Sequence, residues 1–421
     1  MSTVKTSCCV VGGGPAGMMA GLLLARQGVD VLVLEKHKDF LRDFRGDTIH
    51  PATLTLLDEL GFLEDFLRLP HTKMKRVTME TASGPMTIAD FRYFTGRHGY
   101  IVFMPQWDFL TFLAERAAAY PTFRLITNAE VTDLISEGKE VVGVRATTQE
   151  GPVEVRSQLV LGADGRHSTV RRAAGLPIVS KSPPMDVLWF RLERRPGEEL
   201  PFFWRTSRSV LIAINRGSYW QVAFVIPPGA FDQVKAEGIG AFHQAVGAAA
   251  PALADEVRKI GDWNDVQLLS VRVDRLRRWF EPGVLCIGDA AHAMSPAGGV
   301  GINLALQDAV AAANILGPTF SGLGPVLSDL ARVQRRRELP ARVTQAFQVK
   351  VLRGLYPKAS TSQQVMASPP SNSRGERLAV RLLPNVPGLA HVAGRFIGRG
   401  VRPEHIREAA LATTSSSQSS F

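Results

Sequence analysis

The residues best suited to chemistry fall in three glycine-centred motifs that lie far apart in the chain. The first is GGGPAG at residues 12–17, the second is GADGRHS at residues 162–168, and the third is GDAAH at residues 288–292. Glycine lets the backbone approach a phosphate group closely, because no side chain occupies the intervening space. The first motif therefore indicates that a dinucleotide is bound.

The first motif has the surroundings of a nucleotide-binding turn. The apolar run at residues 8–11 predicts a buried strand, and residues 18–27 predict a helix. Gly12 permits the tight turn, Gly14 lets the backbone approach a pyrophosphate, and Gly17 lets the helix and strand pack closely. The pyrophosphate would then lie over free N–H groups at the positive end of the helix.

The next segment adds an acidic residue at the spacing expected for ribose binding. Residues 29–34 predict a second strand, which ends at Glu35, about 20 residues after the glycines. A carboxylate at this place binds ribose hydroxyls and repels a 2′-phosphate, which favours FAD or NAD over NADP. The other cofactor-binding candidates in this part of the chain are Pro15, Ala16 and Lys36.

Together the three motifs resemble those of the class A flavoprotein monooxygenases, the family of p-hydroxybenzoate hydroxylase. The resemblance covers about residues 5–345 and rests on the ordered trio, with the segment PAGGVGIN after the third motif. It implies FAD as cofactor, NADH or NADPH as a transient co-substrate, and dioxygen. It also implies cofactor contacts for Arg45 near the pyrophosphate, for Gln106, for Asp164, Gly165 and Arg166 in a turn supported by Ser168 and Arg171, and for Asp289 on the ribityl hydroxyls.

The segment after the third motif carries the residues expected nearest the reaction. Reduced flavin reacts with dioxygen to give a C4a-hydroperoxide, and the protein supplies positioning and electrostatics. The glycine-rich turn lets backbone lie against the isoalloxazine ring, and its catalytic candidates are Pro296, Gly299 and Gly301. A helix starting near Ile302 would stabilise the anionic reduced ring at its positive end, where Gly301 and Ile302 bind the cofactor and Asn303 contacts the pyrimidine edge.

The middle of the chain is expected to hold the substrate. Aromatic residues gather between 189 and 224 in short β-like runs, so some side chains on alternating positions would face the flavin and form an apolar pocket. This favours an aromatic or polycyclic substrate that is hydroxylated or epoxidised. The residue types leave the catalytic base open among His50, His98, Arg191 and His243, while His292 is interpreted as packing beside the phosphates.

The order of elements predicts an α/β fold: a Rossmann-type FAD-binding domain with α+β elements, an inserted β-sheet substrate domain and a C-terminal helical region. Helices are expected at residues 107–120 and 302–316. The expected divisions are 1–75, 100–177 and 278–345 for the FAD-binding domain, 76–99 and 178–277 for the substrate domain, and 346–421 for the C-terminal region, with a disordered tail near 413–420.

Bulk properties agree with a globular enzyme. The 421 residues suffice for two packed units, and the net charge of +10 is spread through the chain, which favours attraction of anionic cofactors over nucleic-acid binding. Cys8, Cys9 and Cys286 lie in apolar runs, so we expect buried free thiols and a cytoplasmic location, and no metal site is predicted. No apolar run reaches the roughly 18 residues that are needed to span a membrane, so no membrane-spanning segment is expected.

Other functions share parts of these motifs. A flavin-dependent halogenase is disfavoured because its Trp-x-Trp-x-Ile-Pro signature is absent. A reductase of isoprenoid double bonds shares the cofactor motifs and would not need oxygen. A prenyl-binding escort protein on the same fold would not need the intact second and third motifs. Residues 377–407 mix Arg with apolar residues, which favours closing elements of a domain over contact with a membrane surface.

Overall fold

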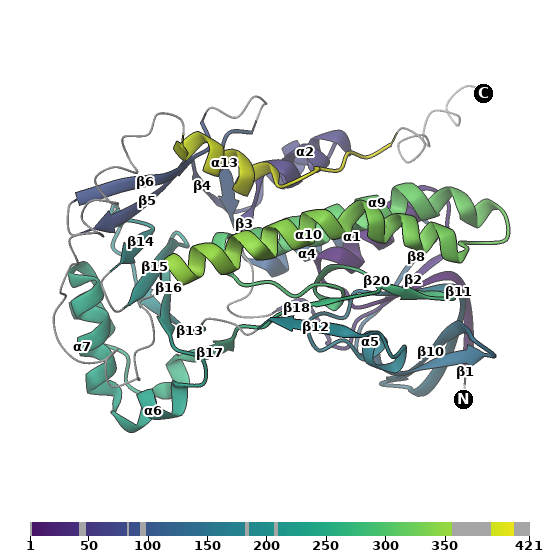
Figure 1. The fold of residues 1–421 in the computed structure, drawn as a ribbon, viewed down its shortest axis with the longest axis horizontal. Coiled ribbons are helices and arrows are strands. Elements are labelled where there is room, and N and C mark those ends of the chain that lie inside the picture. The colour runs from purple at the N-terminus through teal and green to yellow at the C-terminus, as the bar shows by residue number, and fades with distance from the viewer. Residues whose placement is uncertain are drawn as a thin grey trace.

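The computed structural model describes residues 2–41, 48–81, 84–92, 98–181, 185–205, 209–355 and 389–407. Figure 1 shows two β-sheet regions bridged by one long helix. The fold is of the predicted class: an α/β, Rossmann-type FAD-binding unit with a second, mainly antiparallel sheet.

The first sheet has the strand order β19-β20-β11-β1-β2-β8, with the β9–β10 hairpin attached to β11. The strands β20, β11, β1, β2 and β8 run parallel. The last four residues of β1 are fully buried, as expected for a parallel strand covered on both faces. The strands are β1 (Ser2–Val11), β2 (Val31–Leu34), β8 (Phe123–Ile126), β9 (Glu130–Glu137), β10 (Glu140–Thr148), β11 (Gly151–Gly162), β19 (Phe280–Glu281) and β20 (Val284–Cys286).

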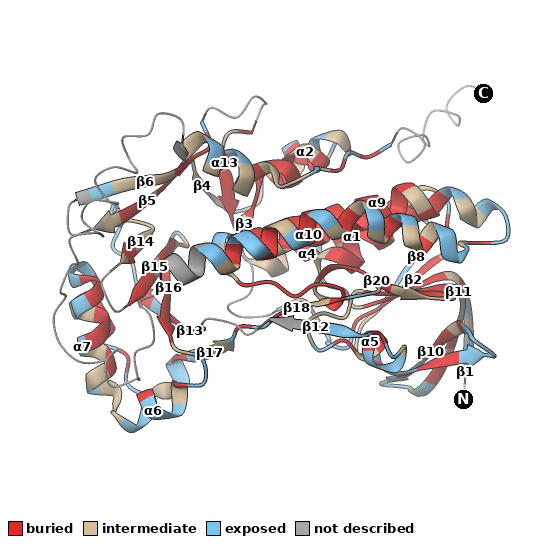
Figure 2. Ribbon diagram, in the orientation of Figure 1, coloured by how far each residue is buried: buried red, intermediate tan, exposed pale blue. Residues whose placement is uncertain are grey.

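Helices cover this sheet in two layers. The helix α1 (Pro15–Arg26) packs against α4 (Gln106–Ala118) and α9 (Val300–Leu316), and α10 (Leu327–Leu355) packs on α9. Nearly every residue of α1 and α9 is buried, which explains their Ala-, Leu- and Gly-rich sequences (Figure 2). The helices predicted at 107–120 and 302–316 are confirmed within two residues at each end.

The second sheet has the order β17-β13-β16-β15-β14-β5-β6. Its strands are β5 (Arg76–Thr81), β6 (Gly84–Asp90), β13 (Asp186–Glu193), β14 (Phe203–Arg205), β15 (Val210–Asn215), β16 (Tyr219–Ile226) and β17 (Gln267–Ser270). Side chains of β13, β15 and β16 alternate between two clusters. One cluster packs on α7 (Ile239–Ala249), and the other faces α10 and the C-terminal helix.

Short elements connect the two sheets. The sheet β3-β7-β4 lies beside α2 (Figure 1), and α3 packs on α2. The pair β12-β18 links the ends of the second sheet to the first. The bounds are β3 (Thr48–Ile49), β4 (Thr72–Met74), β7 (Ile101–Phe103), β12 (Ile178–Lys181), β18 (Val273–Leu276), α2 (Pro51–Glu59), α3 (Leu63–Phe66), α5 (Thr169–Ala173), α6 (Phe231–Ala236) and α8 (Ala254–Val257).

The last described part of the chain consists of α13 (Leu389–Arg399) and residues 400–407. We call residues 400–407 the C-terminal strap. The helix α13 packs tightly on β6, because a Cβ on Gly394 would lie 2.3 Å from the carbonyl oxygen of Asp90. Its packing is that of a closing element of the domain. The tail predicted to be disordered lies outside the described residues.

Two expectations about apolar residues have different outcomes. Cys8, Cys9 and Cys286 are buried and free, as predicted, and burial raises the pKa of the Cys9 thiol to about 12. The expectation that no segment is long and apolar enough to span a membrane is wrong, because residues 300–321 form such a helix. The physical reason is packing, because 83% of an 18-residue apolar stretch of this helix is buried inside the molecule and α9 contacts α1 and α10.

Candidate active site

The three glycine motifs follow parallel strands whose carboxyl ends meet at one edge of the first sheet. Backbone hydrogen bonds join the loops there: Gly12 N–H donates to the Leu34 oxygen at 2.8 Å, and Ala163 N–H donates to the Val11 oxygen at 2.8 Å. A Cβ on Gly288 would lie 3.0 Å from the Cβ of Ala16, so the third motif touches the first. The structure therefore brings the three motifs together.

The glycines of the first motif are of two kinds. Gly12 has a φ of +103°, and its Cβ would lie 2.5 Å from the Ala163 oxygen, while a Cβ on Gly17 would lie 1.9 Å from the Gly12 oxygen. These two glycines are required by the protein's own packing. A Cβ on Gly14 meets nothing within 4 Å, although this residue precedes the first turn of α1.

The start of α1 fits an anionic group. Gly14 provides no side-chain cap, Pro15 follows it, and the first turn carries no acidic residue. The orphan N–H groups of that turn therefore lie at the positive end of the helix dipole, where a Cβ on Gly14 would meet open space. The pyrophosphate of a dinucleotide fits both the space and the charge.

Glu35 is buried and holds the same turn. Its Oε2 accepts a hydrogen bond from Gly13 N–H at 2.8 Å, and its Oε1 accepts one from His37 N–H at 3.0 Å. Because each carboxylate oxygen accepts more than one hydrogen bond, ribose binding remains compatible with these contacts. Its support of the turn was not foreseen from the sequence. The neighbouring Lys36 is exposed.

The second motif is built around Asp164. Its Oδ2 accepts hydrogen bonds from the N–H groups of Thr169 and Val170 at 2.7 and 3.1 Å, which caps the short helix α5. Its Oδ1 is buried and has no partner in the described part of the chain. Burial raises the pKa of this carboxyl. An unpartnered buried oxygen beside the glycine turns suits a hydroxyl or N–H of a bound cofactor.

The supporting residues of the second motif lie as predicted. Ser168 Oγ accepts a hydrogen bond from Arg171 N–H at 2.9 Å and so caps α5. The Arg171 guanidinium donates to the Arg166 oxygen and, at 3.2 Å, to Asp274 on β18. The turn is thus tied to the segment that leads into the third motif. Gly165 lies at a φ of +81° with open space where its Cβ would be.

The third motif rests on a buried ionic cluster that sequence reasoning missed. Asp308 on α9 accepts hydrogen bonds from Gly288 N–H at 3.1 Å, from His292 Nε2 at 2.5 Å and from Arg337 Nε at 2.9 Å. Asp308, His292 and Arg337 are each 1% exposed. Burial alone would raise the pKa of Asp308, but His292 and Arg337 hold it below its usual value.

The only sequence signal for this cluster was a carboxylate in the middle of an Ala-rich helix, since burial of such a group requires partners. His292, which was expected to pack beside the phosphates, stacks on Trp279 with ring centroids 5.0 Å apart. Asp289, which directly follows Gly288 in the sequence, is half-buried.

The turn at residues 296–301 leads directly into the start of α9. Gly298 and Gly299 have φ values of +79° and +62°, and Gly299 N–H donates to the Pro296 oxygen at 3.0 Å. A Cβ on Gly299 would lie 2.1 Å from Thr48 Oγ1, whose hydroxyl donates to the Gly299 oxygen at 2.9 Å. Packing against Thr48 therefore already requires a glycine at 299. A Cβ on Gly301 meets nothing within 4 Å.

The first turn of α9 has no side-chain cap and no acidic residue. Its free N–H groups form a second positive helix end, which suits the anionic N1–C2=O region of a reduced flavin. Asn303 is buried one turn further on, next to Ile302, and its Oδ1 accepts a hydrogen bond from Thr53 Oγ1 at 3.0 Å. That bond orients the amide.

The four candidate bases lie in different places. His50 is fully buried beside the glycine turn, and its Nδ1 lies 2.9 Å from the Ile397 oxygen of α13. Burial lowers the pKa of His50 to about 4, against the opposing effect of the Ile397 and Gly299 carbonyls. Its Nε2 has no partner among the described residues.

The other three candidates are not at the turn. His98 Nε2 lies 3.5 Å from Asp58 Oδ2. On α7, on the other side of the second sheet, His243 Nε2 lies 3.1 Å from the Ile260 oxygen. Arg191 is exposed and stacks over Tyr219. Gln106 begins α4 and is half-buried, and Arg45 lies outside the described residues.

The C-terminal strap reaches the same region. Glu404 accepts hydrogen bonds from Arg336 at 2.7 Å and Arg337 at 3.2 Å, which extends the Asp308 cluster. Ile406 N–H donates to Glu59 on α2 at 2.9 Å. The strap therefore connects the ionic cluster beneath the third motif to α2, the helix that follows His50.

Comparison with known proteins decides the family. The model of a family described as an FAD binding domain matches residues 5–346. The chain belongs to the class A flavoprotein monooxygenases. It is 35% identical to 6-methylpretetramide 4-monooxygenase of Streptomyces rimosus over 365 residues, covering 86% of this chain and 84% of the relative.

A rifampicin monooxygenase of Streptomyces venezuelae is 30% identical and matches 71% of this chain and 61% of its own length. Among solved structures, the OxyS anhydrotetracycline hydroxylase of Streptomyces rimosus superimposes with a TM-score of 0.72 at 25% identity, covering 94% of this chain and 76% of that one. This flavoprotein monooxygenase therefore uses FAD, with NADH or NADPH as the electron donor, and the predictions of enzyme class and cofactors are confirmed.

Proposed function

We propose that this monooxygenase inserts one oxygen atom into a flat aromatic or polycyclic substrate, by hydroxylation or epoxidation, in the cytoplasm. The observation that carries the proposal is the place of α9, whose Asp308 contacts Gly288 of the third motif. At its uncapped start, Gly299 contacts Thr48, which pairs with Phe103 of the apolar cluster on the second sheet. The names of the relatives support it, since 6-methylpretetramide and rifampicin are polycyclic.

The cofactor would lie along the edge where the strands end. The start of α1, with the open space at Gly14, would hold the pyrophosphate, and Glu35 would hold the ribose. Asp289 would bind the ribityl hydroxyls. Asp164 would offer its unpartnered Oδ1 to the cofactor. FAD, when bound and reduced, supplies the two electrons that activate dioxygen.

The residues around the ring would position it and exclude water. Pro296 and Gly299 set the turn, and the open position of Gly301 leaves backbone within reach of a flat ring. The N–H groups at the start of α9 would stabilise negative charge on the reduced pyrimidine, with Asn303 at its edge. The neighbouring α13 contacts this region through the Ile397 oxygen, which lies 2.9 Å from His50 Nδ1.

The second sheet supplies an apolar surface for the substrate. Its face toward α10 carries buried apolar side chains from five of its strands, among them Val77, Val187, Ile214, Ala223 and Val225. Burial of flat apolar area against such a face drives binding, and a few polar groups fix orientation.

Isotope labelling tests the proposal. The FAD-loaded enzyme is supplied with NADH or NADPH and with phenols, quinolones and polyketide-like aromatics under labelled dioxygen. We expect at least one compound to stimulate NAD(P)H oxidation and to gain a single labelled oxygen atom. If product forms at full rate without oxygen, the reductase of isoprenoid double bonds replaces this proposal.

A further inference from the structure

Both faces of the second sheet carry buried polar side chains. On the face that packs on α7, Trp220 is 2% exposed and its indole N–H donates to Glu198 at 2.8 Å. On the face toward α10, which we call the tryptophan face, the strands β13 and β16 carry two buried N–H donors that have no hydrogen-bond partner among the described residues. They are Trp189 Nε1 and Gln221 Nε2.

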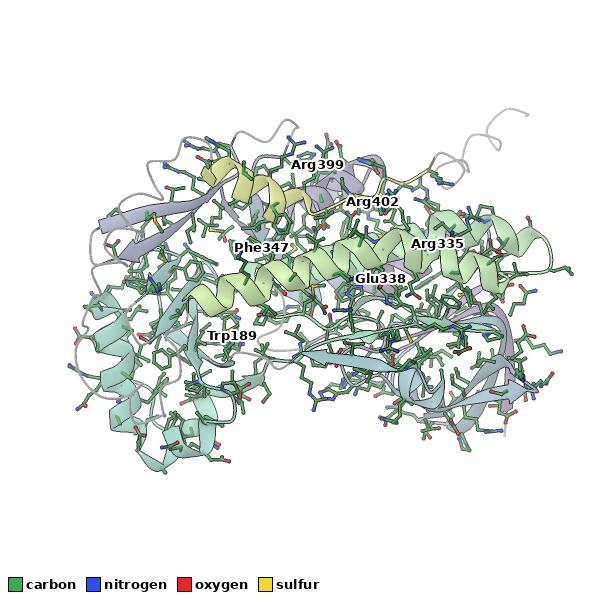
Figure 3. The ribbon with its side chains drawn as sticks, in the orientation of Figure 1. Trp189, Arg335, Glu338, Phe347, Arg399 and Arg402 are labelled. Carbon is green, nitrogen blue, oxygen red and sulfur yellow. The ribbon has the colours of Figure 1, made fainter. Side chains whose placement is uncertain are left out.

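Trp189 lies on β13, among apolar side chains of the tryptophan face. It is 9% exposed, and Figure 3 shows it beneath the end of α10 that carries Phe347. An indole N–H can only donate a hydrogen bond. Because buried polar groups in native proteins nearly always have partners, an acceptor from outside the protein is the expected partner here.

Gln221 lies on β16 and is 4% exposed. Its Oε1 accepts hydrogen bonds from Arg216 Nε at 2.9 Å and from a terminal nitrogen of Arg216 at 2.8 Å. A guanidinium group only donates, so these contacts fix which end of the amide is oxygen. The unpartnered end is therefore the NH₂ group, and it too requires an acceptor.

The two donors are neighbours on one face. Trp189 pairs with Ala223 across β13 and β16, and Gln221 lies two residues from Ala223 on the same side of β16. Diagonal neighbours of this kind have Cα atoms about 7–8 Å apart. Both donors thus lie within the span of one flat molecule of two or more fused rings.

We propose that Trp189 and Gln221 form a donor pair that binds carbonyl or phenolate oxygens on one edge of the substrate. The inference rests on the proposed function and adds a specificity: oxygenated polycycles are selected over hydrocarbons of the same shape. The apolar neighbours Val187 and Val225 bind the rings of either kind of molecule, and only the N–H donors distinguish them.

The test compares 9-fluorenone with fluorene, two flat tricycles that differ by one carbonyl oxygen. Equilibrium dialysis with the FAD-loaded enzyme gives the affinity for each. We expect the wild-type enzyme to prefer fluorenone. Trp189→Phe keeps the ring and removes the N–H, so fluorenone should bind about fivefold more weakly, the value of one neutral hydrogen bond, while fluorene is unaffected.

Two further variants sharpen the comparison. Gln221→Glu keeps the contact with Arg216 and replaces the NH₂ donor by an acceptor. It should therefore lower the affinity for fluorenone at least as much as Trp189→Phe does. Trp220→Phe, on the opposite face, should change neither affinity. Flavin content and unfolding midpoints establish that each variant is folded.

The inference is overturned if the wild-type enzyme shows no preference for fluorenone, or if Trp189→Phe and Gln221→Glu weaken both ligands equally. Failure of the proposed function would look different. In that case the preference for fluorenone and its loss in the variants would persist, while no aromatic compound gained oxygen from labelled dioxygen.

Discussion

The glycine turn at residues 12–17 and the C-terminal strap at residues 400–407 both hold the cofactor edge in place, but they are built differently. The turn is made of backbone: Gly17 lies against the Gly12 oxygen with no room for a methyl group. The strap is made of side chains, since Glu404 reaches Arg336 and Arg337 on α10. The turn has no space for an added methyl group at Gly17. The strap depends on the ion pairs that Glu404 forms with the two arginines.

This difference determines how each region should fail. A backbone contact without spare volume fails when one methyl group is added, because the strand and helix on either side cannot move apart. A buried charge cluster fails when one charge is removed, because its former partner is left desolvated. The following substitutions test that contrast, beginning with the largest expected effect.

Gly17→Ala should have the largest effect. The new Cβ would lie 1.9 Å from the Gly12 oxygen, so α1 and β1 must separate, and we expect a loss of at least about 4 kcal/mol of stability. Gly14→Ala is the matched control, because its Cβ meets only open space. It should fold normally and bind FAD more weakly. Urea unfolding and flavin content measure both effects. Equal stability of the two variants would contradict the distinction between the glycines.

Asp308→Asn should come next. It leaves Glu404 as the one carboxylate, among the described residues, that contacts the buried Arg337 guanidinium, which should cost about 3 kcal/mol. Gly288 also loses an anionic acceptor, so FAD affinity should fall as well. Asp329→Asn is the control, since its partner Arg332 is exposed and the pair should contribute less than about 1 kcal/mol. Chemical unfolding gives the loss of stability in each variant, and FAD titration gives the loss of affinity. Equal losses in the two variants would refute the role of the cluster.

The turn could be predicted from the sequence and the strap could not. Gly12, Gly14, Gly17 and Glu35 lie within one strand–helix–strand unit, where glycine spacing alone fixes the geometry. The strap's contacts join residues far apart in sequence, such as Ile406 and Glu59, and no local pattern records them.

Several side chains also have roles that motifs do not reveal. The need for glycine at 299 arises from Thr48, which is 251 residues away. Asp164 caps α5 with one oxygen, while its other oxygen has no partner in the part of the chain that the structure describes, a division that depends on the three-dimensional turn. The donors of Trp189 and Gln221 lack partners among the described residues because of how the second sheet packs, which no sequence motif records. Roles of the backbone can therefore be predicted from the sequence. Roles of side chains that depend on which groups are buried cannot.

His50, which joins the turn at Gly299 to the strap helix α13, should make stability depend on pH. Its pKa is about 4 in the folded protein, below the ordinary value of 6.5, so the unfolded chain binds more protons between these pH values. Stability from the neutral imidazole is fully present above pH 6.5 and falls as the pH drops toward 4, by about 3 kcal/mol in all. His50→Gln should flatten this slope in urea unfolding between pH 4.5 and 7. An unchanged slope would mean that His50 is not buried in its neutral form.

His405→Ala should have the smallest effect. His405 contacts Glu59 at the rim of the strap, but its side chain is 57% exposed, so solvent screens the pair and about 0.5 kcal/mol is expected. Glu404→Gln, one residue earlier, removes the buried charge that faces Arg336 and Arg337, and should cost about 2–3 kcal/mol. Urea unfolding of the two single variants gives the comparison directly. If His405→Ala proved as costly as Glu404→Gln, the strap would be held by its exposed rim rather than by the cluster beneath the third motif.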